Sequence, residues 1–581
     1  MATDFIDKLT FLSHPSGKGQ GKHHIVIVGA GIIGVCTAYY LTRHADFDPS
    51  THHITILESK RVAGGASGKA GGLLASWAFP QQIVPLSFQL HQDLSDEHDG
   101  ENNWDYRRLT TVSLEADVQN VGPNDDGEDS DSSYSSYSSS CSGSSTSTGS
   151  DSSATGNRLS LKKKLKAKLA SKNKSKTSSS ELEIGSEDPS PKGSSRFHSS
   201  SNIVSSNIPQ NAEESDKSEE SKKKGGASNN STSNNDNNNS NNSNNSSNNN
   251  DDDDDIPLTN LNSDENSGFD MKQSADYSEN KSTSATNSNL NSNSIPLGDP
   301  SNPLPSDLNW IKKNLVKDWS SLGGTDSTAQ VHPYKFTHFL LLKAMETEAV
   351  DLILGKVTKL QYNESGACCG ISYNSTTDDD SVSNDIVDIL DAQQVVLTMG
   401  PWTSKLLPDC PISGLRAHSI TLKPSTGTVS PYAIFTELKI GKNEYFSPEM
   451  YARKDEVYVC GEGDTLVELP ETTDAVEVVR EKCDELYHYV SKLSKNLSNG
   501  HILKRQACYL PVLNVPTSSG PLIGETNVDN LYIASGHSCW GINNAPGTGK
   551  VMAELLLERE TKSADISALD PSLYFDASIL E

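Results

Sequence analysis

Residues 24–34 read HIVIVGAGIIG. Residues 25–28 (IVIV) are apolar and β-branched, as in a strand that is buried on both faces. Residues 35–43 (VCTAYYLTR) have the composition of a helix. A strand, a G-x-G-x-x-G turn and a helix in this order are typical of a Rossmann-like dinucleotide-binding unit, so we expect an α/β fold.

Each glycine of this turn has a separate physical task. Gly29 permits the tight turn, Gly31 lets the backbone approach a pyrophosphate, and Gly34 allows the helix to pack closely on the strand. The N-terminus of the helix then offers free N–H groups and a positive dipole end to the phosphates. The candidate residues of this loop are Gly29, Ala30, Gly31, Ile32, Ile33 and Gly34.

A second apolar strand, residues 54–57, ends in Glu58. Its distance beyond the last glycine is close to that at which an acidic side chain meets the ribose of a bound dinucleotide. The carboxylate would accept hydrogen bonds from the ribose hydroxyls and would repel a 2′-phosphate, which disfavours NADP.

A second glycine cluster occupies residues 64–72. A plain NAD domain has no need of it, whereas the extended cofactor FAD requires backbone close to both its diphosphate and its isoalloxazine. Further glycine turns follow buried strands at residues 394–399 and 531–535. The second of these turns leads to a predicted helix over residues 545–557, with Pro546 in its first turn. Small residues there would leave the helix N-terminus bare, and such an end stabilises the negative charge of a reduced flavin.

These motifs together resemble the D-amino-acid oxidase superfamily of FAD-dependent oxidoreductases, which includes glycine oxidase and sarcosine oxidase. The resemblance rests on residues 29–34, 57–58, 65–72, 400–403 and 536–549 and therefore spans the folded chain. It implies FAD as the cofactor and hydride removal from the C–N bond of an amine or amino-acid-like substrate. It also implies that the edge of the isoalloxazine lies at Gly536, His537, Gly541, Ile542, Asn543 and Asn544. Beyond the first loop, the cofactor-binding residues it implies are Glu58, Ser59, Arg61, Ser67, Gly68, Gly71, Gly72, Val357, Gly400, Trp402, Cys508, Gly536, His537, Gly541 and Ile542.

His537, His332 and Arg416 are the candidate catalytic residues. Histidine suits proton transfer near neutral pH, although a lone histidine is more often structural. In similar proteins a basic side chain binds the substrate carboxylate, but this chain has Leu510 and Asn543 at the two matching positions. Either Arg416 supplies the partner, or the substrate is not a simple amino acid. The sequence predicts no metal site.

Cys508 matches the position at which some family members bond the flavin covalently. Stabilisation of its thiolate, for example by Arg505, would favour that bond. We expect FAD to be bound non-covalently, with attachment through Cys508 as the alternative.

The low-complexity stretch from Val121 to Asn302 is rich in Ser, Asn and Asp, so we predict a disordered insertion. The fold predicted around it is a Rossmann-like FAD-binding domain and an α+β substrate domain with a mixed antiparallel sheet. The FAD-binding domain is expected over 22–76, 331–408 and 504–562, the substrate domain over 77–120 and 409–503, a connecting helix over 303–330, and the insertion over 121–302.

The net charge of −28 over 581 residues argues against nucleic acid as the main partner. Nine cysteines without framework spacing and no long apolar run favour a soluble, cytoplasmic protein of a reducing compartment. The expected partner is a small-molecule substrate.

Fungal proteins that resemble this chain, including its Asn-rich insertion, have been linked with late-endosome to Golgi traffic. The resemblance thus also implies endosomal association, peripheral membrane contact and protein partners of the insertion. The alternative function is an FAD-binding platform that recruits partners with little or no catalysis. The second glycine cluster disfavours an NAD dehydrogenase.

Overall fold

The computed structural model describes residues 9–122, 303–376, 386–426, 429–518 and 520–578. The predicted disordered insertion therefore lies outside the described residues, except for Val121 and Gly122.

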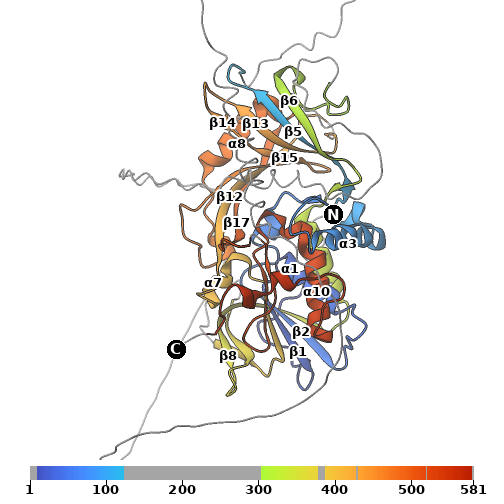
Figure 1. Cartoon of the computed structure of the whole chain (residues 1–581), viewed down its shortest axis with the longest axis vertical. Coiled ribbons are helices and arrows are strands. Elements are labelled where there is room, and N and C mark those ends of the chain that lie inside the picture. The colour runs from blue at the N-terminus through green and yellow to red at the C-terminus, as the bar shows by residue number, and fades with distance from the viewer. Residues whose placement is uncertain (1–8, 123–302, 377–385, 427–428, 519, 579–581) are drawn as a thin grey trace, which may run out of the picture. The chain divides into compact units, whose positions relative to one another are not determined.

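The first sheet has a parallel centre (Figure 1). Strands β8, β2, β1, β11 and β19 pair in parallel, and antiparallel strands complete both edges. Its strands in spatial order are β10 (Ile386–Leu390), β9 (Cys368–Ser375), β8 (Val350–Tyr362), β2 (His52–Glu58), β1 (His23–Val28), β11 (Gln394–Leu397), β19 (Leu531–Ser535) and β18 (Leu522–Glu525). Strand β1 lies centrally because its apolar side chains are buried on both faces, as the sequence predicts.

Four helices contribute to the core on one face of this sheet. They are α1 (Ile32–Leu41), α3 (Val84–His98), α6 (Pro333–Met345) and α10 (Gly541–Glu558). Helices α1 and α10 pack closely (Figure 1). Gly549 permits this approach, because an added Cβ would lie 2.5 Å from the carbonyl carbon of Cys36.

The second sheet is antiparallel except where β5 and β13 pair in parallel. Helix α8 (Arg480–Leu493) contributes to its core. Its strands in spatial order are β17 (His501–Leu513), β12 (Ile412–Lys423), β16 (Val457–Asp464), β15 (Glu449–Ala452), β13 (Tyr432–Lys439), β5 (Thr110–Asp117) and β6 (Val316–Gly323), and β14 (Tyr445–Phe446) pairs with β13. A small third sheet joins β3 (Leu73–Ala75), β7 (Thr328–Gln330) and β4 (Arg107–Arg108).

The position of the insertion follows from strand pairing. Strands β5 and β6 flank it in the chain and are antiparallel neighbours in the second sheet. The insertion thus occupies the place of a hairpin connection, where a long loop adds little closure entropy.

The predicted fold class is confirmed: two large sheets of mixed orientation with helices packed on them. The predicted connecting helix over 303–330 is wrong, because this segment holds one short 3-10 turn and the strands β6 and β7. Helix α10 begins at Gly541, so Pro546 lies inside it rather than in its first turn. Residues 84–103, predicted as substrate domain, form α3 and α4 (Gly100–Asn103), and α3 packs on α10.

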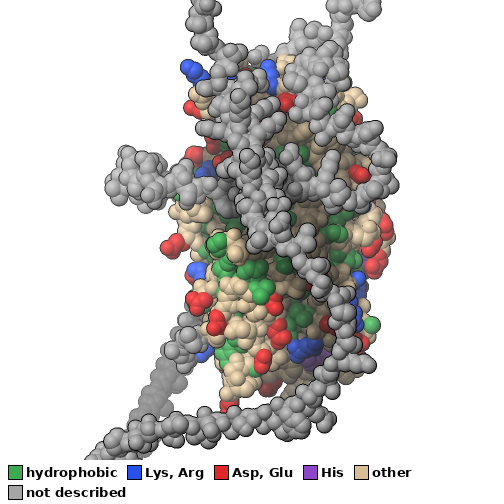
Figure 2. Space-filling model, viewed as in Figure 1, with side chains coloured by type: hydrophobic (Ala, Val, Ile, Leu, Met, Phe, Trp, Pro, Cys, Tyr) green, Lys and Arg blue, Asp and Glu red, His purple; other side chains and the backbone are tan. Residues whose placement is uncertain are grey.

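The described residues include no helix with both the length and the apolar character needed to cross a membrane. Figure 2 shows acidic side chains scattered over the visible face rather than gathered in one patch, with basic side chains between them.

Candidate functional site

Two cavities meet at the carboxyl ends of β1 and β2. The first encloses about 300 Å³ and extends to residues 355–358 of β8. The second encloses about 130 Å³ and extends to the N-terminus of α10 at Gly541. The two cavities share part of their walls, namely Gly29, Glu58, Met399, Trp402 and Thr473. An extended ligand could therefore occupy both.

The structure brings most of the predicted cofactor residues to these two cavities. Those that line one or both are Gly29, Gly31, Ile32, Ile33, Glu58, Ser59, Ser67, Val357, Gly400, Trp402, His537, Gly541 and Ile542. The predicted residues outside both linings are Ala30, Gly34, Arg61, Gly68, Gly71, Gly72, Cys508 and Gly536.

The glycines of the first loop differ in their surroundings. Gly29 has a φ of +110°, which favours glycine. An added Cβ at Gly34 would lie 2.2 Å from the Gly29 carbonyl oxygen, so Gly34 serves packing. At Gly31 an added Cβ would lie 3.2 Å from Ser67 Oγ and, apart from the adjoining backbone, within 4 Å of no other atom of the described residues. The backbone at Gly31 is thus open toward the cavity, where a cofactor phosphate would need close approach.

The N-terminus of α1 faces the same cavity. Its N-cap residue is Gly31, which has no side chain to cap the helix. The Ile32 N–H donates to Ser67 Oγ at 2.9 Å, so the second glycine cluster touches the first loop. Helix N-termini of this kind bind anions through N–H groups and the helix dipole. The two loops together fit a diphosphate.

Glu58 is the buried carboxylate at the junction of the cavities. It accepts hydrogen bonds of 3.1 Å from the N–H groups of Ala30 and Lys60. Burial raises the pKa of Glu58, and these hydrogen bonds oppose the rise. The carboxylate is therefore held in place with lone pairs left for a ribose hydroxyl.

Arg61 points away from this junction. Its guanidinium pairs with Asp474, and its side chain is 60% exposed. At the other end of the first cavity, Lys356 and Lys405 both contact the carboxylate of Glu471, at 2.7 and 2.8 Å. These three residues line the rim of the cavity.

The opposite end of the site is the turn before α10. Gly536 has a φ of +90°, and His537 and Gly541 then line the second cavity. His537 contacts Thr548 Oγ1 at 3.1 Å. Burial lowers the pKa of His537 to about 3, so the imidazole is neutral near pH 7. The neutral imidazole can donate or accept a hydrogen bond with a ligand, but it carries no positive charge.

The side-chain amides of Asn543 and Asn544 form hydrogen bonds within the protein rather than facing a ligand. Asn543 Oδ1 accepts from the Ala75 N–H at 2.9 Å, and its Nδ2 donates to Asn544 Oδ1 at 3.0 Å. Asn544 Nδ2 donates to the Phe79 carbonyl at 3.0 Å. These bonds fix the first turn of α10 against β3.

His332 and Arg416 line neither cavity. His332 precedes α6, and its Nε2 lies 3.9 Å from Glu456. Arg416 is buried, with its guanidinium 3.1 Å from Asp464 and 2.5 Å from Glu477. Because two carboxylates already satisfy Arg416, we do not assign a substrate carboxylate to it.

Cys508 lies on β17 beside, rather than in, the second cavity. Burial raises the pKa of its thiol to about 11, and the positive charge of Lys69 opposes that rise. Arg505, expected to stabilise the thiolate, instead binds Asp484 at 2.6 Å. Lys69, which sequence reasoning missed, donates to the Ala507 carbonyl at 3.0 Å.

Two polar side chains of α3 were also missed, because no motif marks them. Pro546 has no N–H for the carbonyl of Ile542, and His91 Nε2 lies 3.0 Å from that carbonyl instead. Ser87 bonds to the next turn of α10. His91 and Ser87 are four residues apart, so both lie on one face of α3. This spacing is the one feature of the sequence that could have indicated a shared role.

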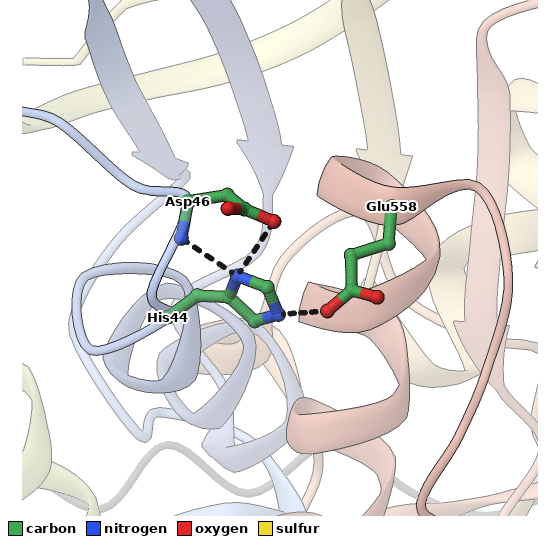
Figure 3. Close-up of side chains that lie close together, drawn as sticks. All are labelled: His44, Asp46 and Glu558. Carbon is green, nitrogen blue, oxygen red and sulfur yellow. Dashed lines mark hydrogen bonds and ion pairs between the residues drawn. The ribbon is translucent and has the colours of Figure 1, made fainter.

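A third group of charges lies away from the cavities. His44 lies between Asp46 and Glu558, with Nε2 2.9 Å from Glu558 and Nδ1 3.9 Å from Asp46 (Figure 3). The ammonium of Lys562 also contacts Glu558. The two carboxylates meet opposite nitrogens of one ring, so we describe the group as an ion-pair network and assign no metal to it.

The family of this chain follows from its similarity to known proteins. The family model described as "FAD dependent oxidoreductase" matches residues 24–126 and 303–555. A Saccharomyces cerevisiae protein named "Putative oxidoreductase TDA3" is 52% identical over 602 residues, covering 100% of both chains. A Schizosaccharomyces pombe protein named "Putative oxidoreductase C1F5.03c" is 26% identical over 559 residues, covering 95% of this chain and 98% of that protein.

Among solved structures, the L-amino acid deaminase of Proteus myxofaciens in complex with anthranilate is similar with a TM-score of 0.50. The alignment covers 97% of this chain and 96% of that one at 13% identity, which shows a shared fold. The family match resumes after the insertion and ends within α10. The chain belongs to the family of FAD-dependent oxidoreductases.

Proposed function

We propose that this protein binds FAD non-covalently and oxidises the C–N bond of an amine or amino-acid-like small molecule. The observation that carries the proposal is the pair of cavities with a shared wall, which joins β8 and Glu58 to the N-terminus of α10. FAD is an extended dinucleotide, so it could reach from the first cavity into the second.

We assign the ends of the cofactor from the chemistry of the walls. Val357 and Glu58 would hold the adenosine, with the ribose on the carboxylate. Gly31, the N-terminus of α1 and Ser67 would hold the diphosphate. His537 and Gly541 would lie at the isoalloxazine. Backbone N–H groups at the start of α10 would favour the negative charge of the reduced ring.

FAD, when bound, supplies the acceptor for a hydride and so carries the redox chemistry itself. The substrate loses that hydride from carbon and a proton from nitrogen and becomes an imine, which water hydrolyses. The protein must orient the C–N bond and keep bulk water away. The apolar residues Leu510 and Ile542 on the wall of the second cavity suit that task.

We also propose that different segments of the chain divide these tasks. Residues 22–76, 331–408 and 504–562 would bind FAD, and residues 409–503 with the strand β5 would cover the substrate. Helix α3 belongs with the first group, since it braces α10.

Anaerobic titration of the purified flavoprotein with amines and amino acids tests the proposal. Bleaching of the oxidised-flavin absorbance by a member of the panel supports it. Bound FAD that no member bleaches favours the alternative, a platform for trafficking partners. That alternative depends on the insertion, which lies almost entirely outside the described residues.

A further inference from the structure

A carboxylate lies on the second sheet, on the face that carries two stacked tyrosines. Glu449 on β15 is opposite Cys460 on β16, and Tyr451 is opposite Tyr458. The Tyr451 hydroxyl donates to Glu449 Oε2, and the Cys460 thiol lies 3.8 Å from the same oxygen. Glu449 Oε1 has no hydrogen-bond partner among the described residues.

This face lies next to the flavin end of the cofactor site. A Cβ at Gly71, in the second glycine cluster, would lie 2.2 Å from the Tyr451 ring. Ala70, the residue before Gly71, lines the second cavity, as does Cys539. Burial raises the pKa of the Cys539 thiol, and the negative charge of Glu449 adds to that rise. Glu449 is partly accessible, and burial raises its pKa, while the hydrogen bonds with Tyr451 and Cys460 oppose the rise.

No cation within the described residues forms an ion pair with Glu449. The nearby Arg453 donates to the carbonyls of Ala70 and Gly71 and pairs with Glu456. Lys69 donates to the Ala507 carbonyl. A carboxylate removed from bulk water without a cation is costly, and a positively charged ligand would offset that cost.

The positions where a carboxylate-binding residue is expected offer no free positive charge to a substrate. Leu510 is an apolar part of the cavity wall, the amide of Asn543 is bonded within the protein, and Arg416 is already paired. Beside the second cavity the described residues therefore place the negative charge of Glu449, and none of Leu510, Asn543 and Arg416 supplies a free cation there.

We propose that Glu449 binds the nitrogen of an amine substrate that carries no carboxylate on the carbon to be oxidised, so that the protein selects alkylamines over α-amino acids. This inference deepens the proposed function and rests on it. Glu449 Oε1 accepts a hydrogen bond from the amine, and Tyr451 holds the carboxylate in place through Oε2.

A shape-matched pair of non-oxidisable ligands tests the charge preference by binding alone. The carbon attached to nitrogen in tert-butylamine has no hydrogen to lose, and pivalate has the same shape with the opposite charge. We expect tert-butylamine to perturb the flavin spectrum and raise the melting temperature of the holoprotein, and pivalate to do neither. Equal or tighter binding of pivalate would overturn the inference.

Variants then assign the preference to one residue. Glu449→Gln should weaken tert-butylamine binding by about 10- to 100-fold, the range for a charge-assisted hydrogen bond. Glu462→Gln, an exposed carboxylate further along β16, is the matched control and should leave it unchanged. Unchanged binding in Glu449→Gln would contradict the assignment. If that variant does not hold FAD, binding of tert-butylamine and pivalate to the natural chain still tests the preference for a positively charged ligand.

An oxidisable pair separates this inference from the proposed function. Isoamylamine is leucine without its carboxylate. Faster flavin reduction by isoamylamine supports both proposals, and faster reduction by leucine refutes the amine preference while the oxidase function stands. If neither these two nor any other amine or amino acid reduces the flavin, the proposed function fails, and the binding preference is judged by tert-butylamine and pivalate.

Discussion

The hydroxyl of Ser87 on α3 donates a 2.7 Å hydrogen bond to the Asn543 carbonyl on α10. It also accepts a 2.9 Å bond from the Gly547 N–H. In a regular helix Gly547 would bond to Asn543 directly. The Ser87 hydroxyl bridges the two groups next to Pro546, so it sets the direction in which the start of α10 faces the second cavity.

Replacement of Ser87 by alanine should therefore destabilise the protein and weaken FAD binding. Two buried backbone groups lose their partner, and we expect the free energy of unfolding to fall by about 1–3 kcal/mol. Urea unfolding at fixed FAD concentration measures the loss. Gln89→Ala, an exposed change on the same helix, should stay within about 0.5 kcal/mol of the natural chain. Equal effects of the two changes would show that the bridge has no such role.

Gly31→Ala should weaken FAD binding, whereas Gly34→Ala should lower the stability of the fold. The new methyl at Gly31 meets only Ser67 Oγ, so the fold should survive while affinity for FAD falls by about tenfold or more. The methyl at Gly34 meets the Gly29 carbonyl at 2.2 Å, and the strain should lower stability by about 1–3 kcal/mol. Flavin content and thermal unfolding of each variant separate the two effects. A Gly31→Ala variant with unchanged FAD affinity would argue against the predicted diphosphate site.

FAD should be released when the protein is unfolded in acid. The pKa of the Cys508 thiol is raised to about 11, which leaves little of the nucleophilic thiolate at neutral pH. Filtration after acid unfolding should carry the yellow colour into the filtrate, and Cys508→Ser should keep its flavin. Colour that stays with the unfolded protein, and is lost in that variant, would establish the covalent alternative.

Stability should fall as the pH drops below about 6.5, the pKa of histidine in an unfolded chain. Burial lowers the pKa of His537 to about 3 and that of His91 to about 4. Between the folded and unfolded pKa values only the unfolded chain binds the proton, so acid favours unfolding.

His537→Gln removes one of the two histidines that take up a proton on unfolding. Its curve of unfolding free energy against pH should be shallower by about 1.4 kcal/mol per pH unit between about pH 6 and pH 4. Urea unfolding at several pH values and saturating FAD gives both curves. Parallel curves would mean that His537 is not held neutral in the folded protein.

The sequence predicts the nucleotide end of the site better than the substrate end. Gly29, Gly31 and Glu58 follow a local pattern, because one strand, one turn and one helix create the phosphate loop. Glu449, Ser87 and Lys69 belong to no such pattern. They come near the proposed site through pairing of distant strands and packing of distant helices, which a single sequence does not reveal.

The predicted connecting helix failed for a similar reason. Strand β6 lies at the edge of the second sheet, where exposed and half-buried side chains weaken the alternation typical of a strand. Its structure depends on pairing with β5, from which it is separated by the whole insertion. The composition of the β6 segment alone does not indicate its pairing with β5.

Anaerobic reduction of the bound flavin tests the central claim most directly. The purified holoprotein, mixed with a panel of alkylamines and amino acids without oxygen, should lose its oxidised-flavin absorbance with at least one amine. The amine should be consumed in equal amount to the flavin that is reduced. A protein that holds FAD but keeps its absorbance through the whole panel would contradict the assignment as an amine-oxidising enzyme.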